Sequence, residues 1–371
     1  MTFALSYVFL AITSSCWSVD GAITRKRLVV FLINAVFIYA LARVGSMLEI
    51  ALLGFVCTGA VGLISLGIDI FVQHTFAPLD PDYRFMGVMT ANFQAMNLLV
   101  CLLCGLTLAQ RRPQVLRWMS PLLLLFTFLL FITRARVGTF LCLGMMVFVL
   151  LRLAKQHLEP LMRALTMIVV LTVLVPMGVF AIGRSGGGAL TDVFMMGRKD
   201  TQNTASLSNR APLWAELMQS VDQRPLLGFG FEAFWSPERV ERISFDQGWM
   251  VPHAHNTYLD QMLSLGAVGS FLFASTLIGG CVVAWRRYRR RPDESSLLPA
   301  LLLTWLAILS LTESTPVSPY LPTLIAYSCL VKLCMVEGSE AEWDTQISAG
   351  DIFSPLPAHL TAGSGLQEAH S

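Results

Sequence analysis

The residues best suited to chemistry lie in the stretch 251–260, which reads VPHAHNTYLD. It places two histidines, an asparagine, a tyrosine and an aspartate before a long apolar segment, 261–285, that carries no charged residue. Histidine has an ordinary pKa near neutrality, so His255 could exchange a proton with a substrate at working pH. The alternative interpretation is that these residues cap and anchor a membrane helix, with Tyr258 in the aromatic belt at the membrane interface.

A second set of candidates consists of arginines near the ends of apolar segments. Arg84 precedes one such segment, Arg134 and Arg136 lie in a short turn between two others, and Arg210 begins a predicted loop helix. A guanidinium stays charged and binds phosphate oxygens through two parallel hydrogen bonds, so these arginines suit a phosphate-bearing ligand. For any one arginine, contact with lipid phosphates is the competing interpretation. That interpretation is weaker for the turn pair, because charge in a tight apolar turn costs free energy unless it has a partner.

Metal binding is a further possibility for the two histidines. His253 and His255 have only Asp260 nearby as a third ligand, whereas protein zinc sites use three or four such side chains in a suitable geometry. We therefore predict neither a metal nor a cofactor. Glu313 lies between two apolar segments, and we interpret it as part of a polar turn rather than as a second carboxylate of the site.

Composition indicates that these residues belong to a membrane protein. Hydrophobic residues make up 55% of the 371-residue chain and charged residues only 13%, whereas soluble domains carry about 25% charged residues. The net charge of +2 gives no reason to expect a nucleic-acid partner. Apolar runs predict an all-α polytopic fold of about ten transmembrane helices, at roughly 2–18, 28–42, 48–70, 91–109, 118–133, 137–152, 163–183, 258–285, 296–313 and 319–336.

Basic residues set the predicted orientation. The cluster Arg286–Arg291 indicates the cytoplasmic side of the membrane, because Lys and Arg are enriched in cytoplasmic loops. Both termini then lie inside, and Arg25–Arg27 is the exception that this topology leaves outside. The predicted domains are N-terminal transmembrane helices (1–183, about seven), a large periplasmic loop between spans seven and eight (184–256), C-terminal transmembrane helices (257–336, about three) and a cytoplasmic tail (337–371) with a composition typical of disorder.

The large loop contains two recognisable features. An amphipathic helix is predicted over Ala211–Asp222, with Trp214, Leu217, Met218 and Val221 on one face. Further on, we interpret Phe234 and Trp235 as anchors at the membrane interface. The CxxC of Cys101 and Cys104 lies inside an apolar run, which favours buried small side chains over redox or zinc chemistry.

Motifs spread over about residues 15–280 resemble the O-antigen ligase and Wzy-type polymerase superfamily of bacterial membrane glycosyltransferases. In chain order they are Trp17–Asp20 (WSVD), Arg84–Gly87 (RFMG) with Asn92, Arg136–Leu141 (RVGTFL), Asn209–Arg210 with Trp214, Pro225–Phe231 (PLLGFGF) with Phe234–Trp235, and His255–Leu259 (HNTYL) with Gly266 and Gly269. The Phe-Trp pair after the Gly-x-Gly is most similar to the exopolysaccharide-polymerising branch. The chain departs from the family pattern at Ala135, where Ser is frequent, in its second arginine Arg134, and in having about ten spans rather than about twelve.

The resemblance implies a GT-C-like fold in the bacterial inner (cytoplasmic) membrane and metal-independent glycosyl transfer at the periplasmic face. The donor would be an oligosaccharide on undecaprenyl pyrophosphate, and the acceptor a sugar hydroxyl of another glycan or of the lipid A core. Other polysaccharide assembly proteins would be further partners. The predicted catalytic residues are His255 as general base with Arg210 and Arg136 on the leaving pyrophosphate, and the predicted substrate-binding residues are Arg84, Arg134, Asn256 and Tyr258.

Two other functions compete with this one. A transporter or flippase for lipid-linked glycan would have charged residues within its spans and two related halves, whereas the spans here are nearly free of charge. A non-catalytic membrane component of a polysaccharide assembly system would tolerate the loss of each outer histidine or arginine singly.

Overall fold

The structure is a computed structural model that describes residues 2–80, 83–111, 113–157, 210–314 and 320–336. At some helical positions, Arg136 among them, it describes the backbone but not the side chain. The chain divides into two units, Met1–Leu333 and Cys334–Ser371, and every arrangement given below lies within the first.

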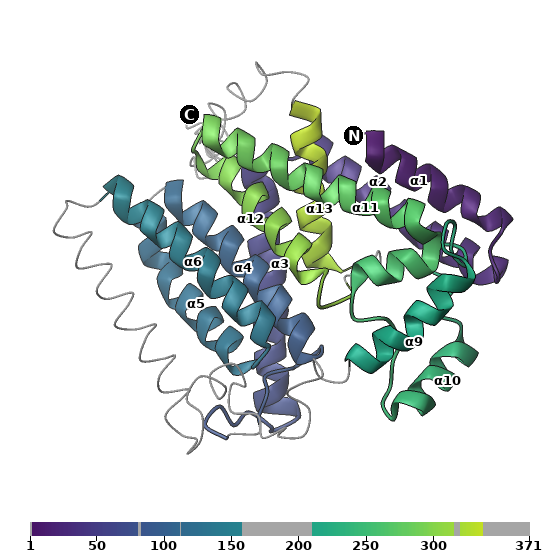
Figure 1. The fold of residues 1–371 in the computed structure, drawn as a ribbon. Coiled ribbons are helices and arrows are strands. Elements are labelled where there is room, and N and C mark those ends of the chain that lie inside the picture. Colours follow the sequence, from purple (N-terminus) through teal and green to yellow (C-terminus); the bar gives the residue numbers. More distant parts are fainter. Residues whose placement is uncertain (1, 81–82, 112, 158–209, 315–319, 337–371) are drawn as a thin grey trace, which may run out of the picture. The chain divides into compact units, whose positions relative to one another are not determined.

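All regular elements in the described ranges are helices, which confirms the predicted all-α fold there (Figure 1). They are α1 (Thr2–Thr13), a 3-10 turn (Ser14–Cys16), α2 (Gly21–Val44), α3 (Met47–Gly67) with a π-helical turn (Ile68–Val72), α4 (Ala91–Arg111), α5 (Pro113–Ile132), α6 (Arg136–His157), α9 (Arg210–Gln223), α10 (Pro237–Gln247), α11 (Thr257–Arg290), α12 (Glu294–Leu309) and α13 (Leu321–Val336).

Each predicted span within the described ranges corresponds to a helix, whereas the predicted span 163–183 lies outside them. Among the described residues, four helical stretches are long and apolar enough to cross a membrane: Gly21–Val44, Met47–Phe71, Ala91–Gln110 and Thr257–Arg290. The remaining apolar helices are shorter, so the count of ten spans stays a prediction. The chain is thus a multi-pass membrane protein.

The second helix corrects the sequence interpretation. α2 extends over 24 residues and begins well before the predicted residue 28. The cause is a helix cap, because Oδ1 of Asp20 accepts hydrogen bonds from the N–H groups of Ala22 and Ile23, both at 2.9 Å. Arg25–Arg27 therefore lies in the first turns of a helix and not in an outer loop.

α4 forms the centre of the helix bundle and packs against α3, α5, α6 and α12 (Figure 1). Its close approach to α3 depends on small residues, because a Cβ at Gly54 would lie 2.7 Å from Sγ of Cys104. Cys101 and Cys104 are both buried with free thiols, which confirms that the CxxC serves packing.

α11 is broken near its start, at Gly266, where φ is +66° and ψ is −165°. The preceding Gly-rich loop supplies backbone partners at this break. The carbonyl of Pro225 accepts from the N–H of Ala267 at 2.8 Å, and the N–H of Gly230 donates to the carbonyl of Ser264 at 2.9 Å. The loop and the two helical segments of α11 are therefore joined through their main chains.

This interlocking explains why glycine recurs in both segments. A Cβ at Gly266 would lie 2.2 Å from the carbonyl carbon of Leu226, and one at Gly228 would lie 2.6 Å from the carbonyl of Ser264. Both glycines also have positive φ, which side chains disfavour. Gly230 similarly faces Ser18, so the loop also binds the turn between α1 and α2.

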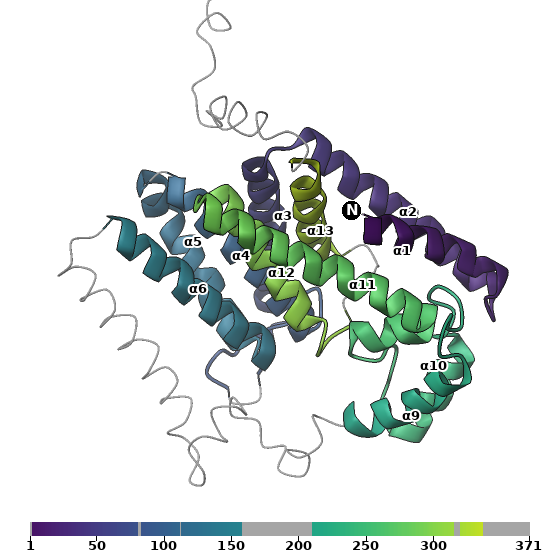
Figure 2. The same ribbon diagram turned by 45° about the horizontal axis from the view of Figure 1, so that its top comes forward.

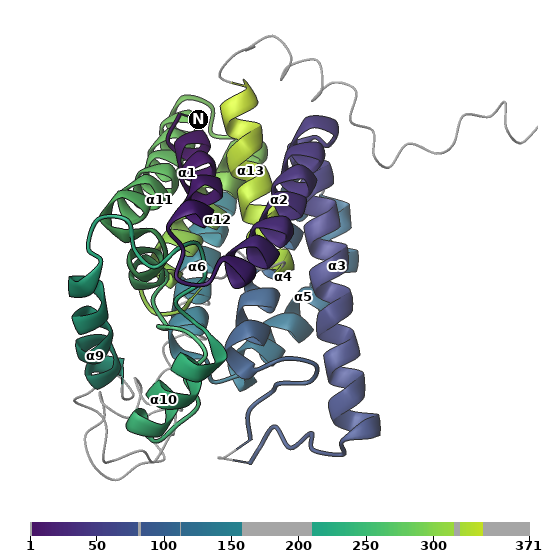
Figure 3. The same cartoon turned by 90° about the vertical axis from the view of Figure 1, so that its right-hand side faces the viewer.

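Part of the large loop packs against the start of α11. α9, α10 and the start of α11 share a hydrophobic cluster that includes Leu213, Leu217, Phe234, Ile243 and Leu263. Figure 2 and Figure 3 show α9 and α10 together at one end of the bundle, beside the start of α11.

The predicted amphipathic helix in this loop is present as α9, with Leu213, Leu217 and Val221 buried. Met218, which we expected on the same face, is instead 44% exposed. The predicted interface anchors are also placed differently. Phe234 is buried in the cluster, and Trp235 donates its indole N–H to a carboxylate of α11.

Candidate active site

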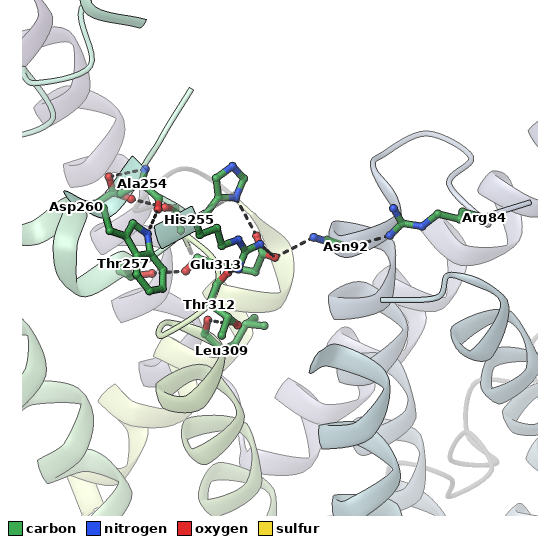
Figure 4. A network of polar contacts seen from close by, with 12 residues as sticks. Arg84, Asn92, Ala254, His255, Thr257, Asp260, Leu309, Thr312 and Glu313 are labelled. Carbon is green, nitrogen blue, oxygen red and sulfur yellow. Dashed lines mark hydrogen bonds and ion pairs between the residues drawn. The ribbon is translucent and has the colours of Figure 1, made fainter. Parts of the chain in front are cut away.

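A polar network surrounds the carboxylate of Glu313, in the turn after α12 (Figure 4). Oε1 of Glu313 accepts hydrogen bonds from Nη2 of Arg210 at 2.9 Å and from Nδ2 of Asn92 at 2.8 Å. Oε2 lies 3.4 Å from Nδ1 of His255. The Glu313 side chain is 13% exposed, and those of Arg210 and His255 are 18% exposed. The network thus brings the predicted catalytic residues His255 and Arg210 onto one carboxylate.

Helix ends position the basic side chains of this network. Arg210 is the first residue of α9, and its Nη1 also donates to the carbonyl of Thr312. Asn92 lies in the first turn of α4, and its Oδ1 accepts from Nη2 of Arg84 at 3.3 Å. Nε of Arg84 donates to the carbonyl of Thr133, just beyond α5, at 3.1 Å. The predicted substrate-binding residue Arg84 is therefore joined to the same network through Asn92.

The loop that carries His255 is held by the carboxylate of Asp260. Oδ1 of Asp260 accepts from the backbone N–H of Ala254 at 3.1 Å and from Nε1 of Trp235 at 2.8 Å, while Oδ2 accepts from the hydroxyl of Ser314. These bonds hold His255 in a left-handed backbone conformation, with φ of +50°. Non-glycine residues in this conformation are uncommon and occur preferentially at functional sites.

Two neighbouring aromatic rings flank the His255 side chain. The ring centroids of His253 and Trp249 lie 4.2 Å and 5.4 Å from that of His255. Nε2 of His255 and Nδ1 of His253 are buried without a hydrogen-bond partner in the described part of the chain. A buried polar atom without a partner carries a cost in free energy, so each of these nitrogens has a hydrogen-bonding capacity that no described group uses.

Burial and neighbouring charges shift the pKa values of His253 and Glu313. Burial, together with the adjacent His255, lowers the pKa of His253 to about 4, so His253 is neutral at pH 7. For Glu313, burial favours the neutral acid, but the hydrogen bond from His255 and the charge and hydrogen bond of Arg210 outweigh it. The pKa of Glu313 is consequently lowered, and its carboxylate is ionised at neutral pH.

The remaining predicted site residues have different surroundings. Nη2 of Arg134 donates to the carbonyl of Asp80 at 2.7 Å, away from Glu313. Asn256 caps α11 by accepting from the N–H of Leu259 at 3.1 Å, and the hydroxyl of Tyr258 donates to the carbonyl of Ala307 at 3.2 Å.

Arg136 begins α6, and the catalytic prediction for it concerns a side chain outside those that the structure describes. The substrate-binding role of Arg134, Asn256 and Tyr258 stays a prediction.

Sequence reasoning assigned Glu313 to a polar turn and gave Asp260 no part in positioning the site. Glu313 does lie in a turn, but its carboxylate is the centre of the network. The available signal was a carboxylate in a short polar turn, in a sequence that also has several arginines near the ends of other apolar segments. Within the described ranges, no three His, Cys, Asp or Glu side chains are grouped so as to hold a metal ion.

The arrangement provides the parts needed for transfer to a hydroxyl group. His255 offers a ring nitrogen to a proton, and Arg210 and Arg84 offer guanidinium groups to an anionic leaving group. His255 and Arg210 lie at the starts of α11 and α9 and contact one ionised carboxylate, and Arg84 is linked to that carboxylate through Asn92.

Comparison with known proteins finds a similarity to one family. The family model described as O-antigen ligase matches residues 121–274, which include Arg134, Arg136, Arg210 and His255. A search of the curated proteins found no match. The match confirms the resemblance predicted from the sequence motifs, and residues 121–274 of the chain are similar to the O-antigen ligase family.

Proposed function

We propose that this protein is a membrane glycosyltransferase that transfers a glycan from undecaprenyl pyrophosphate to a sugar hydroxyl at the periplasmic face. The observation that carries this proposal is that His255 and Arg210 both contact the carboxylate of Glu313. Polymerisation of exopolysaccharide or O-antigen repeat units is the favoured reaction, on the resemblance of the Phe234–Trp235 motif. Ligation of O-antigen to the lipid A core uses the same donor and is the alternative.

In the proposed reaction, the acceptor oxygen forms a bond to the anomeric carbon of the donor glycan. The bond between that carbon and the pyrophosphate oxygen breaks, and undecaprenyl pyrophosphate leaves with the electron pair. His255 takes the proton of the acceptor hydroxyl. Arg210 and Arg84 neutralise the negative charge that grows on the leaving group, and Arg136 is predicted to act with them.

The ends of α11 support a periplasmic site. His255 immediately precedes the start of this helix, whereas its last turn carries Arg287, Arg289 and Arg290. Because basic residues are enriched on the cytoplasmic side, the two ends are expected on opposite faces of the membrane. A periplasmic location also suits a donor whose glycan is already assembled on its lipid.

The test compares a deletion strain that expresses either the wild-type protein or His255→Ala. Surface polysaccharide and undecaprenyl-linked intermediates are resolved by size in each strain. Accumulation of single lipid-linked repeat units without long chains in the variant supports a polymerase. Long lipid-linked chains that fail to reach an acceptor support a ligase. No change in either pool, with equal protein in the membrane, contradicts both.

A further inference from the structure

The carboxylate of Glu313 contacts two of the residues to which the proposed function assigns chemistry, His255 and Arg210. Its two oxygens are divided between them, because Oε1 accepts from Arg210 and Asn92 while Oε2 faces Nδ1 of His255. From this geometry we propose that Glu313 is the positioning residue of the reaction, which orients His255 as a base and holds Arg210 ready for the pyrophosphate. The inference rests on the proposed function and deepens it.

The ionisation of Glu313 determines which nitrogen of His255 carries the proton. An ionised carboxylate can only accept hydrogen bonds, so Nδ1 of His255 must be the donor to Oε2. In the neutral imidazole, Nε2 then carries the lone pair. Nε2 is the nitrogen that is buried without a partner in the described part of the chain, which makes it the one available to an acceptor hydroxyl. Glu313 thus selects the tautomer that can act as a base.

The same carboxylate stabilises the product of the proton transfer. When Nε2 takes the proton, His255 becomes a cation that faces Oε2 of Glu313 at 3.4 Å. The carboxylate of Glu313 lies opposite this charge, and opposite charges attract each other strongly where water is largely excluded. The other charged or titratable groups around His255 are His253, whose ring centroid lies 4.2 Å away, Asp260, which interacts with it electrostatically, and Arg210, which shares Glu313 with it.

The position of Glu313 is itself fixed by the main chain. The backbone carbonyl of Glu313 accepts from the hydroxyl of Thr257 at 2.9 Å, and the N–H of Thr257 donates to the carbonyl of Ser310 at 2.8 Å. These bonds join the start of α11 to the turn after α12. Thr257, two residues after His255, therefore fixes the turn that carries Glu313 against the start of α11.

The proposal predicts an unusual kinetic signature for Glu313→Gln. The variant keeps a side chain of nearly the same size but loses the charge. We expect kcat to fall at least about 100-fold, because an unoriented base loses most of the contribution of general base catalysis. The donor KM should stay the same or decrease, because removal of a negative charge beside Arg210 does not weaken pyrophosphate binding.

The experiment measures initial rates of glycan transfer by purified full-length protein in nanodiscs, with an undecaprenyl-pyrophosphate-linked glycan as donor. Rates are recorded against donor concentration and pH for the wild type, Glu313→Gln, Glu313→Asp and the control Glu216→Gln. Glu216 is a carboxylate of α9 that accepts a hydrogen bond from Gln247 at 2.8 Å and has no assigned part in the reaction. Replacement of this carboxylate by the amide of Gln should therefore leave kcat and KM unchanged. The acidic limb of the kcat–pH profile should move to lower pH in Glu313→Gln and return towards the wild-type position in Glu313→Asp.

Three results would overturn the proposal. They are a kcat within about threefold of wild type in Glu313→Gln, a higher donor KM with kcat unchanged, or an equal loss of kcat with no shift of the pH profile. If Glu313→Gln does not accumulate in the membrane, Glu313→Asp decides, since its profile should keep the wild-type acidic limb while kcat falls. Full transfer activity of His255→Ala would instead contradict the proposed function itself, whatever Glu313→Gln shows.

Discussion

The indole N–H of Trp235 donates a hydrogen bond to Oδ1 of Asp260 over 2.8 Å. The same oxygen accepts the backbone N–H of Ala254, so a tryptophan of the large loop helps to fix the residue before His255. Trp235 of the Phe-Trp motif is therefore joined to the loop of His255 through a carboxylate of α11.

The first prediction concerns this bond. Trp235→Phe keeps an aromatic ring but removes the donor, which leaves a buried carboxylate oxygen short of a partner. We expect a loss of about 1–3 kcal/mol in the free energy of unfolding and a lower transfer rate. Thermal unfolding in detergent measures the first effect. Trp118→Phe, at a position that is 86% exposed in α5, is the control and should match wild type.

The second prediction separates catalytic from structural roles. His255→Ala and Arg210→Ala should each abolish glycan transfer while the amount of protein in the membrane stays normal. His253→Ala should have a much smaller effect, because His253 makes no contact with Glu313 among the described hydrogen bonds and ion pairs. Immunoblots of membranes and size analysis of the glycans provide the two readouts. If all three variants lose only membrane abundance, the catalytic assignments are wrong.

The third prediction tests the break in α11. Gly266→Ala would place a Cβ 2.2 Å from main-chain atoms of Leu226, in a backbone conformation that alanine disfavours. We expect a loss of about 2–4 kcal/mol or failure to accumulate. Gly279 lies in the same helix, and a Cβ at this position would have open space within 4 Å, so Gly279→Ala should stay within about 1 kcal/mol of wild type. Equal stability of the two variants would show that the loop does not interlock with the helix.

The fourth prediction is a loss of stability in acid. The folded protein keeps His253 neutral down to about pH 4, whereas its ordinary pKa is 6.5, so the unfolded chain binds a proton that the folded chain excludes. The stability that this difference contributes is present above pH 6.5 and is lost as the pH falls towards 4. Glu313, whose pKa is lowered from 4.5, adds a further loss below that value.

Thermal unfolding between pH 7.5 and 4.5 measures this loss. His253→Gln cannot titrate, so its unfolding temperature should fall less steeply with acidification than that of the wild type. His74→Gln, at an exposed position, should keep the wild-type slope. A wild-type slope in His253→Gln would mean that other groups cause the acid sensitivity.

Much of the fold followed from hydrophobic pattern and helix caps. Long, mostly apolar runs predicted α3, α4 and α11 to within about five residues, because helices that cross a membrane are predominantly apolar. The start of α2 was misplaced because its first turns carry Arg25–Arg27, and charge concealed a helix that Asp20 caps. α10 was not predicted, although Ser236 followed by Pro237 is a typical helix start.

The site was predictable in its residue types but not in its connections. Histidine and arginine at the ends of apolar segments indicated proton transfer and phosphate binding, and two of them do meet. The choice of Glu313 as their common partner depends on how α4, α9, α11 and α12 pack, which no local pattern encodes. The side chains of Asn256 and Tyr258 form hydrogen bonds with main-chain groups, and these contacts could not be predicted from the sequence for the same reason.

The interlocking of the Gly-rich loop with α11 has a consequence for the order in which the protein is assembled. Main-chain groups at a helix break cannot remain without partners in an apolar medium, so the break at Gly266 becomes tolerable only once residues 225–230 have docked on it. Those residues precede α11 in the chain and leave the ribosome earlier. The nascent chain therefore presents the partner before the break that needs it, and translation in the N-to-C direction suits the insertion of this helix.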